Sequence, residues 1–318
     1  MSRARRALLG LISRAAVGGS ITPEEEERLA GELRLLGFRG ALRTHLLRRM
    51  MGAALRGGEV RLVFPALNGL FTLACSTQDT GVGSEILGTG IHEPHVVEFY
   101  RGFLRPGMVV VDVGANIGFH AVHAAKLVQP GGRVVAVEPD PVNAGLLAFS
   151  VTLNPGLPVE VIQAALSDAG GTLILSDLGN AGNSGARFTH RDRASLERLV
   201  HGPQPQFSTA RALRWDDDHL DVPVSLVKID VEGHEPQVLR GMEGAIARHR
   251  PVILTEFAPA NLRDLGGIEP TDYLAWFRQR GYRGALLDEA GGPPRALPGE
   301  AVPDPGDRHH VDLVFTPG

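Results

Sequence analysis

Cysteine and long apolar runs are the scarcest features of this 318-residue sequence. The single cysteine, Cys75, excludes an internal disulfide framework and predicts a reducing compartment, so we expect a cytoplasmic protein. No apolar run approaches the roughly 20 residues that a helix needs to cross a bilayer, so no transmembrane segment is expected. The amino terminus superficially resembles a signal peptide, but Arg14 interrupts its short apolar stretch, and a cytosolic helix is the preferred interpretation.

A strong net charge is also absent. The formal net charge of −4 argues against bulk binding of nucleic acid. Only two of the 32 basic residues are lysines, Lys126 and Lys228, which we interpret as compositional bias of the genome. The charge is unevenly distributed, because residues 1–60 contain eleven Arg against six Glu, a balance of +5.

Residues 1–58 are predicted to form a helical extension. The segment 22–25 (Thr-Pro-Glu-Glu) supplies an N-cap, a first-turn proline and a capping-box acid. Leu29, Leu33 and Leu36 then fall on one face of a helix. The arginines of this extension either face water or form a basic surface that docks a membrane, an acidic carrier protein or an anionic acceptor. We favour the first alternative, because Arg-rich helix faces usually face water.

Residues 59–318 are predicted to form a single α/β domain. After a short hairpin, apolar β-branched runs alternate with helical segments over about 200 residues, which predicts a doubly wound, mostly parallel sheet with helices on both faces. Residues 179–212 are expected to be loop-rich, and residues 171–176 to form a short extra strand. Seven strands are expected in the sheet, at residues 109–113, 133–138, 159–166, 225–231, 251–257, 284–288 and 311–315.

The segment 109–118 (VVVDVGANIG) has the pattern of a buried strand, a glycine turn and the start of a helix. Gly114 and Gly118 remove Cβ atoms where the backbone must turn sharply and approach a ligand closely. The helix that follows aims its N-terminal N–H groups at that ligand. Asp112, at the end of the strand, faces the same position.

Acids occupy the carboxyl ends of the predicted strands, where ligands bind in doubly wound sheets. Glu138 lies twenty residues past Gly118, where a carboxylate can accept both hydroxyl protons of a ribose. Asp168, after the third strand, is placed to accept from an adenine amine. Five acids are expected to converge on one crevice: Asp112, Glu138, Asp168, Asp230 and Glu256.

The order of residues in the glycine turn distinguishes between nucleoside-type cofactors. A dinucleotide site favours G-x-G-x-x-G, whereas here Asp112 precedes the first glycine in the order Asp112-x-Gly114-x-Asn116-x-Gly118. A carboxylate at the mouth of the turn repels a pyrophosphate and attracts a cation. S-adenosyl-L-methionine carries a sulfonium and an ammonium and no phosphate, so we predict it as the cofactor, with these four residues at its methionine part.

Several motifs in the same order resemble the FkbM family of S-adenosylmethionine-dependent methyltransferases. They are VVVDVGANIGFH, VVAVEPDPVN, AALSDAGGTLIL, the Asn183-Ser184-Gly185 segment and LVKIDVEGHEPQVLRGM followed by RPVILTEF. The resemblance covers about Gly90 to Phe257 and implies a class I (Rossmann-like) methyltransferase fold. It further implies O-methylation of a hydroxyl on a sugar, a glycolipid or a polyketide-type metabolite. The sequence departs from the family at His92, where an aromatic residue is usual, and at Arg214-Trp215, where Thr-Leu is more common.

Methyl transfer from a sulfonium is an in-line displacement, and a hydroxyl acceptor also needs a base to remove its proton. Asp230, Glu232 and His234 lie at the fourth strand–helix junction and are predicted to be catalytic, with His234 the preferred base because its ordinary pKa lies near neutrality. Asp230 alternatively orients the acceptor or the cofactor amine. His120 faces either the pocket or the core, and Glu256 is placed to take a second hydroxyl of the acceptor.

Three clusters contain metal-ligand residue types, at residues 92–95, 216–219 and 309–310, but none has a spacing that fixes a geometry. No metal site is predicted, although the use of a divalent ion stays open because some O-methyltransferases need one. The sequence leaves two alternative functions. An NAD-dependent oxidoreductase on a similar sheet is disfavoured by Asp112 and Asn116. A non-catalytic binding module that keeps the cofactor fold is disfavoured because the strand-end acids are all retained.

Overall fold

The computed structural model describes residues 61–76, 79–179, 183–200, 205–289, 291–297, 299, 301–306 and 309–318. The helices predicted for residues 1–58 lie outside these described residues. The chain divides into two compact units, Met1–His92 with Gly182–Ser184, and Glu93–Ala181 with Gly185–Gly318. The domain boundary expected at residue 58 stays a prediction. No helix of the described residues is both long enough and apolar enough to cross a membrane.

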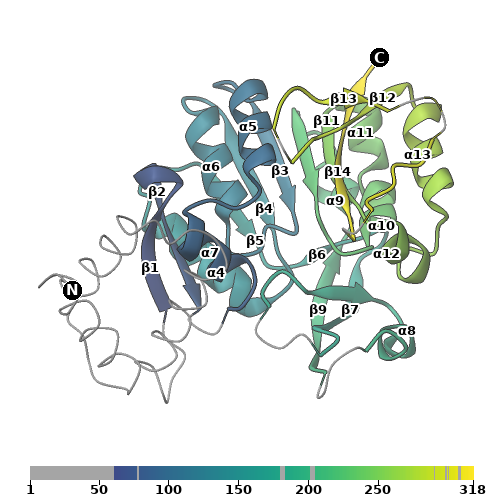
Figure 1. Cartoon of the computed structure of the whole chain (residues 1–318), viewed down its shortest axis with the longest axis horizontal. Helices are drawn as coiled ribbons and strands as arrows, with labels where there is room; N and C mark the ends of the chain where they lie inside the picture. Colours follow the sequence, from purple (N-terminus) through teal and green to yellow (C-terminus); the bar gives the residue numbers. More distant parts are fainter. Residues whose placement is uncertain are drawn as a thin grey trace, which may run out of the picture. The chain divides into compact units, whose positions relative to one another are not determined.

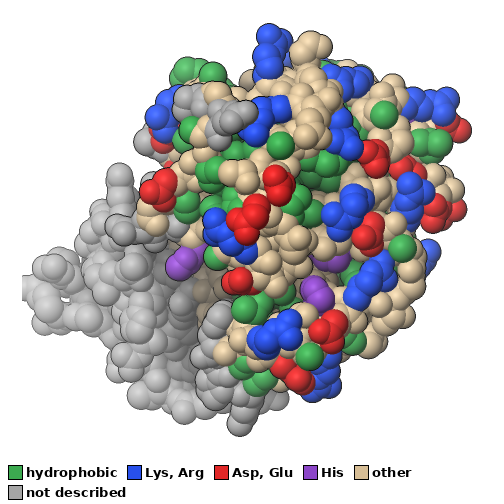
Figure 2. Space-filling view, turned by 90° about the vertical axis from the view of Figure 1, so that its right-hand side faces the viewer, with side chains coloured by type: hydrophobic (Ala, Val, Ile, Leu, Met, Phe, Trp, Pro, Cys, Tyr) green, Lys and Arg blue, Asp and Glu red, His purple; other side chains and the backbone are tan. Residues whose placement is uncertain are grey.

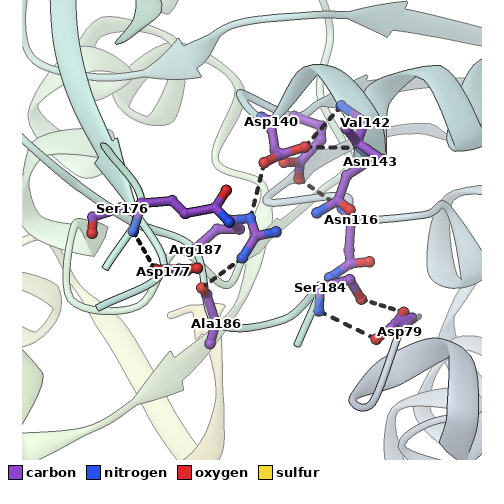
Figure 3. Close-up of polar contacts among 12 residues, drawn as sticks. Asp79, Asn116, Asp140, Val142, Asn143, Ser176, Asp177, Ser184, Ala186 and Arg187 are labelled. Atoms are coloured by element: carbon purple, nitrogen blue, oxygen red, sulfur yellow. Dashed lines mark hydrogen bonds and ion pairs between the residues drawn. The ribbon is translucent and has the colours of Figure 1, made fainter. Parts of the chain in front are cut away.

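The described part of the first unit is a hairpin followed by a helix. Strands β1 (Arg61–Ala66) and β2 (Phe71–Ser76) pair antiparallel around the short helix η1 (Leu67–Gly69), which confirms the predicted hairpin. Helix α4 (Val82–Thr89) follows. The Asp79 carboxylate organises the turn before α4, because it accepts hydrogen bonds from the Gly81 and Gly83 amides, both at 2.8 Å. It also accepts the Ser184 hydroxyl at 2.6 Å (Figure 3).

The second unit is built on an eight-stranded sheet (Figure 1). The first five strands in the order below pair in parallel and the last three pair antiparallel, so the predicted doubly wound sheet is confirmed, while its parallel part is smaller than predicted. The two-residue strand β13 was not predicted. The order across the sheet is β5 (Val159–Ile162), β4 (Arg133–Val137), β3 (Val109–Val113), β10 (Leu226–Ile229), β11 (Val252–Phe257), β14 (Val311–Pro317), β12 (Tyr282–Leu286) and β13 (Arg295–Ala296).

Both faces of this sheet are covered by helices, as Figure 1 shows. Successive side chains of a strand point to opposite faces, so the apolar residues of the central strands divide into two cores. One face packs against α5 (Pro94–Phe103), α6 (Phe119–Val128) and α7 (Pro141–Thr152). The other packs against α10 (Glu235–Gly241), α11 (Glu243–His249), α12 (Pro259–Asp264) and α13 (Pro270–Gln279). This double coverage explains why the strands are continuous apolar runs.

A second sheet, of order β6-β9-β7-β8, corrects two predictions. The run 159–166 is not one strand, because its last residues form β6 and pair with β9 in the second sheet. The segment 179–212, expected to be loop-rich, contains β8 and most of β9. β9 (FSTARAL) contains no run of large apolar residues, so its strand pattern is weak in the sequence. The elements are β6 (Ala165–Leu166), β7 (Gly171–Ser176), β8 (Phe188–His190), α8 (Arg193–Glu197), β9 (Phe207–Leu213) and α9 (Trp215–Asp218).

The surface of the second unit carries mixed charge. On the face in Figure 2, Lys and Arg side chains are interspersed with Asp and Glu. Many of these groups form exposed ion pairs such as Arg263 with Glu269 at 3.0 Å, where the two side chains are 51% and 63% exposed. Pairs of this kind contribute little to stability, so the buried cores and the buried polar groups decide the energetics.

Candidate active site

The turn after β3 requires glycine at two positions. Gly114 has a φ of 80°, and a Cβ atom there would lie 1.8 Å from the Asp230 carbonyl oxygen. Gly118 has a φ of 94°, and a Cβ atom there would lie 2.3 Å from Cδ1 of Leu147. Asn116, between them, adopts a left-handed backbone with a φ of 50°, a conformation that asparagine tolerates better than most residues. The turn therefore brings the backbone against β10 on one side and α7 on the other.

Glu138 links this turn to the end of β4. The residue is 4% exposed. One carboxylate oxygen accepts the Asn116 amide at 2.8 Å and the other accepts the Asp140 amide at 2.9 Å. Burial raises the pKa of Glu138 to about 7, although these two hydrogen bonds act in the opposite direction. Because each oxygen has a second lone pair, the carboxylate can accept two further hydroxyl protons without losing its backbone partners.

Arg187 and Asp140 form an ion pair beside Glu138 that sequence reasoning missed. The Arg187 Nε atom lies 2.9 Å from Oδ2 of Asp140, and Figure 3 shows the guanidinium extending toward that carboxylate. The other Asp140 oxygen caps α7 by accepting the Val142 and Asn143 amides at 2.8 and 3.1 Å. The Asp-Pro pair that opens α7 is a helix-start signal, but nothing in the sequence identifies Arg187 as its partner.

Asp112 is a buried carboxyl group on the central strand. It is 1% exposed, and among the described residues neither of its oxygens has a hydrogen-bond partner. Lys228 lies opposite it in the register of β3 and β10, and the Lys228 ammonium contacts Asp230 at 2.7 Å. Burial raises the pKa of Asp112 to about 6, and the Lys228 charge opposes that shift. Asp112 is thus a buried acceptor next to the glycine turn.

Charged residues cover the carboxyl end of one sheet face. Each of these residues lies two positions, or four for Asp230, along its strand from an apolar residue that packs against α5 and α6. Side chains an even number of positions apart point to the same face of a sheet, so the charged residues share that face. The mutual effects of these groups on their pKa values show that they lie close together. The face carries Asp112 from β3, Lys228 and Asp230 from β10 and its end, Glu256 from β11 and Asp312 from β14.

Three imidazole–carboxylate pairs border this charged face. His120, on α6, contacts Glu93 at 2.8 Å, so of its two predicted orientations it takes the one toward the charged groups. His95, on α5, contacts Asp312 at 2.5 Å. The third pair joins the Nδ1 atom of His310 to the carboxylate of Glu256 at 3.1 Å.

The junction after β10 holds a strained acid. Glu232 has a φ of 55°, in the left-handed region that a long side chain rarely adopts. Its carboxylate accepts the Asn261 amide at 3.2 Å. Burial, followed by the charges of Asp230 and Glu235, raises the pKa of Glu232 to about 8. Strain of this kind clusters at functional sites, which keeps Glu232 and Asp230 as candidates for contact with an acceptor.

His234 lies at the same junction but in a different environment. It is 3% exposed, and its Nε2 atom contacts the Ser167 hydroxyl at 3.0 Å. Burial lowers the pKa of His234 to about 3. An imidazole with so low a pKa is neutral at pH 7 but binds a proton weakly, which makes it a poor base. Its role as the base stays a prediction.

Asp168 was expected at the tip of a main-sheet strand, but it lies elsewhere. It follows β6 of the second sheet and pairs with Arg191 at 2.9 Å and Arg240 at 3.5 Å. Of the five acids that were expected at strand ends of the main sheet, Asp168 therefore lies elsewhere, and the convergence of the others on one crevice stays a prediction. Its contact with an adenine stays a prediction.

The doubly wound sheet and the glycine turn with acids at two neighbouring strand ends define a class I, Rossmann-like methyltransferase. Residues 112–283 match the family model described as the methyltransferase FkbM domain. The chain belongs to this family, as the sequence motifs indicated.

Three curated relatives show how far the similarity extends. The methyltransferase sdnD of Sordaria araneosa is 27% identical over 181 residues, which is 48% of this chain and 68% of sdnD. The 31-O-demethyl-FK506 methyltransferase FkbM of Streptomyces tacrolimicus is 30% identical over 165 residues, 45% of this chain and 62% of FkbM. The hexuronic acid methyltransferase AglP of Haloferax volcanii is 29% identical over 160 residues, 49% of this chain and 59% of AglP. The chain thus spans less than two thirds of the latter two proteins.

Among solved structures, the FkbM methyltransferase of Methylobacillus flagellatus KT is similar with a TM-score of 0.41 and 18% identity. The match covers 69% of this chain and 50% of that one.

Proposed function

We propose that this protein is an S-adenosylmethionine-dependent O-methyltransferase. The observation that carries the proposal is the glycine turn of the FkbM domain with Asp112 before it and Glu138 behind it. Glu138 is placed to accept the ribose hydroxyls, since both of its oxygens have a free lone pair. Gly114, Asn116 and Gly118 would hold the methionine part by letting it approach the backbone closely, since the amides of these three residues already donate to Val137, Glu138 and Ala115.

The charge of the cofactor supports this assignment. Asp112 is buried without a hydrogen-bond partner among the described residues, and Asp230 shares the charge of Lys228. A cationic ligand compensates such carboxylates, whereas a pyrophosphate is repelled by them. S-adenosylmethionine, when bound, supplies an electrophilic methyl group on a sulfonium. The residues of the chain bind it, orient the acceptor and exclude water.

The acceptor in this proposal is a hydroxyl group on a sugar, glycolipid or polyketide-type metabolite. Two relatives are named as methyltransferases of 31-O-demethyl-FK506 and of hexuronic acid, and these names support this class of acceptor. In this proposal Asp230 and Glu232 orient the hydroxyl, and the catalytic roles of His120 and His234 stay predictions. The cytoplasmic location and the docking role of residues 1–58 also stay predictions.

Calorimetry followed by a transfer screen tests the proposal. S-adenosylhomocysteine should bind the purified protein and raise its melting temperature, and NAD should do neither. Methyl-labelled S-adenosylmethionine should then label members of a panel of monosaccharides, glycosides and 31-O-demethyl-FK506. Stabilisation by NAD alone would favour the oxidoreductase, and tight binding of S-adenosylhomocysteine without any labelling would favour a non-catalytic module.

A further inference from the structure

The three imidazole–carboxylate pairs at the carboxyl edge of the sheet differ in exposure. The side chains of His95 and His120 are 7% and 6% exposed, whereas that of His310 is 43% exposed. A base must reach the proton that it removes. Of these three imidazoles, His310 is therefore the one that an incoming hydroxyl group can contact directly.

The contact between His310 and Glu256 orients the imidazole. Glu256 is 7% exposed, and one of its oxygens lies 3.1 Å from the His310 Nδ1 atom. A carboxylate acceptor at Nδ1 holds the proton there and leaves the lone pair on Nε2. The second Glu256 oxygen is buried and has no hydrogen-bond partner among the described residues, so the carboxylate is committed to this one imidazole.

The position of this pair follows from the strand register. β14 runs antiparallel to β11, with Phe257 opposite Val311, so His310 stands at the carboxyl end of β11. Burial, followed by the charges of Glu232 and of Asp230 at the end of the adjacent strand β10, raises the pKa of Glu256 well above its usual range. A hydrogen bond from the His310 Nδ1–H group acts in the opposite direction, because it favours the charged carboxylate. The Asp230 carbonyl in turn lies against Gly114 of the cofactor turn. The pair thus lies along the same edge as the proposed methyl donor, on the side of the charged face away from Glu138.

We propose that His310, oriented by Glu256, is the base that takes the proton of the acceptor hydroxyl. This inference rests on the proposed O-methyltransferase function. The acceptor oxygen forms a bond to the methyl carbon as the bond from that carbon to sulfur breaks, and the electron pair of that bond stays on sulfur. The hydroxyl proton moves to Nε2 of His310 and from there to solvent. No oxidant, reductant or further reactant is required.

The assignment moves the base away from His234, whose imidazole is occupied by Ser167 inside the protein. It also gives Glu256 a positioning role in place of the acceptor contact expected from the sequence. A base of this kind contributes about 10²- to 10⁴-fold to the rate. The pair should therefore affect turnover and leave cofactor affinity unchanged.

The experiment compares His310→Ala, Glu256→Gln and the neighbouring control His309→Ala with the wild-type protein. Methyl transfer to methyl glucoside, methyl glucuronide and 31-O-demethyl-FK506 is measured with labelled S-adenosylmethionine, and S-adenosylhomocysteine affinity is measured by calorimetry. His310→Ala should lose at least about 10² in kcat with unchanged affinity, and added imidazole should restore part of the rate. Glu256→Gln should lose less, and His309→Ala should keep the wild-type rate.

The outcomes distinguish a failure of the base assignment from a failure of the proposed O-methyltransferase function. A His310→Ala variant that keeps its rate, or that loses it without any rescue by imidazole while binding the cofactor normally, overturns the role of His310. The melting temperature of His310→Ala shows whether the variant is folded. If it is not, His310→Gln replaces it, because glutamine keeps the size and polarity of the side chain but cannot act as a base. A wild-type protein that binds S-adenosylhomocysteine and methylates none of the hydroxyl probes overturns the O-methyltransferase function and this base together.

Discussion

Glu138 is buried, yet each of its carboxylate oxygens keeps a lone pair that can accept a further hydrogen bond. These two properties together suit it to bind the ribose hydroxyls. Two backbone amides fix its carboxylate, so the free lone pairs point in set directions before any ligand arrives. Preorganisation of this kind raises affinity because little ordering remains to be done on binding.

Replacing Glu138 with Ala should weaken S-adenosylhomocysteine binding by about 10- to 100-fold, since two hydrogen bonds to a charged acceptor are lost. Calorimetric titration measures the effect. Glu160→Ala is the matched control, because Glu160 is exposed on β5. An affinity for Glu138→Ala equal to that of the control would refute the ribose assignment.

Gly114 lies where the cofactor turn approaches the end of β10 too closely for any side chain. Gly114→Ala should lower the free energy of unfolding by at least about 1–3 kcal/mol and abolish cofactor binding, because a Cβ atom would meet the Asp230 carbonyl oxygen at 1.8 Å. Gly145→Ala serves as the control, since a Cβ atom at Gly145 meets nothing within 4 Å inside α7. That helical substitution should stabilise the protein by roughly 0.5–1 kcal/mol. Urea unfolding distinguishes the two, and equal effects would contradict the close approach.

At the scale of elements, Arg187 ties the segment before β8 to the start of α7. The pair with Asp140 is partly buried, with side chains 24% and 11% exposed, so water screens it less than the surface pairs. Asp140 also caps α7 and donates its amide to Glu138. The loop from the second sheet thereby holds the residues that flank the proposed ribose site.

Arg187→Ala should reduce S-adenosylhomocysteine affinity by about 3- to 10-fold and lower the melting temperature, because Asp140 loses its cationic partner. Arg187→Lys should recover only part of the affinity, since an ammonium cannot reproduce the geometry of the guanidinium. The matched control is Arg193→Ala, because Arg193 pairs with Glu197 at the surface, where the two side chains are 59% and 51% exposed. Thermal shift and calorimetry report the result, and an Arg187→Ala affinity no different from the control would show that the ion pair is irrelevant to binding.

For the whole molecule, the buried acids and the buried histidine give opposite pH dependences. Burial raises the pKa of Glu138 to about 7 and of Glu232 to about 8, so their contribution to stability is complete below their unfolded values and is lost as pH rises through the folded ones. Burial lowers the pKa of His234 to about 3, so its contribution is present above the ordinary value of 6.5 and is lost below it.

Above pH 6.5 the two acids therefore dominate. The free energy of unfolding of the ligand-free protein should fall between pH 6.5 and 8.5, as measured by urea titration with the fluorescence of the buried Trp215 as the signal. Glu138→Gln and Glu232→Gln should each make this dependence shallower, because the amide does not ionise. A stability that rises over the same interval would contradict the assignment of burial as the dominant effect.

Sequence reasoning succeeded where neighbours along the chain decide the structure. The turn at Gly114 and Gly118 and the acid at Glu138 follow a strand that is apolar on both faces, and this pattern is local. It failed for the strand at 159–166, which divides between two sheets at Gln163 and Ala164, because the pattern along the chain does not reveal where a strand leaves one sheet for another. It also missed β9, because FSTARAL contains no run of large apolar residues.

The sequence by itself determined the class of fold, the family and the position of the cofactor turn. Each depends on residue types at fixed spacings within one strand–turn–helix unit. Only the tertiary structure decided which polar groups meet. It enclosed His234 against Ser167, paired Arg187 with Asp140 and brought His310 to Glu256 at the carboxyl edge. These pairings depend on the order of strands in the sheet and on burial, which sets the pKa of each group, and neither is encoded in the spacing of residues along the chain.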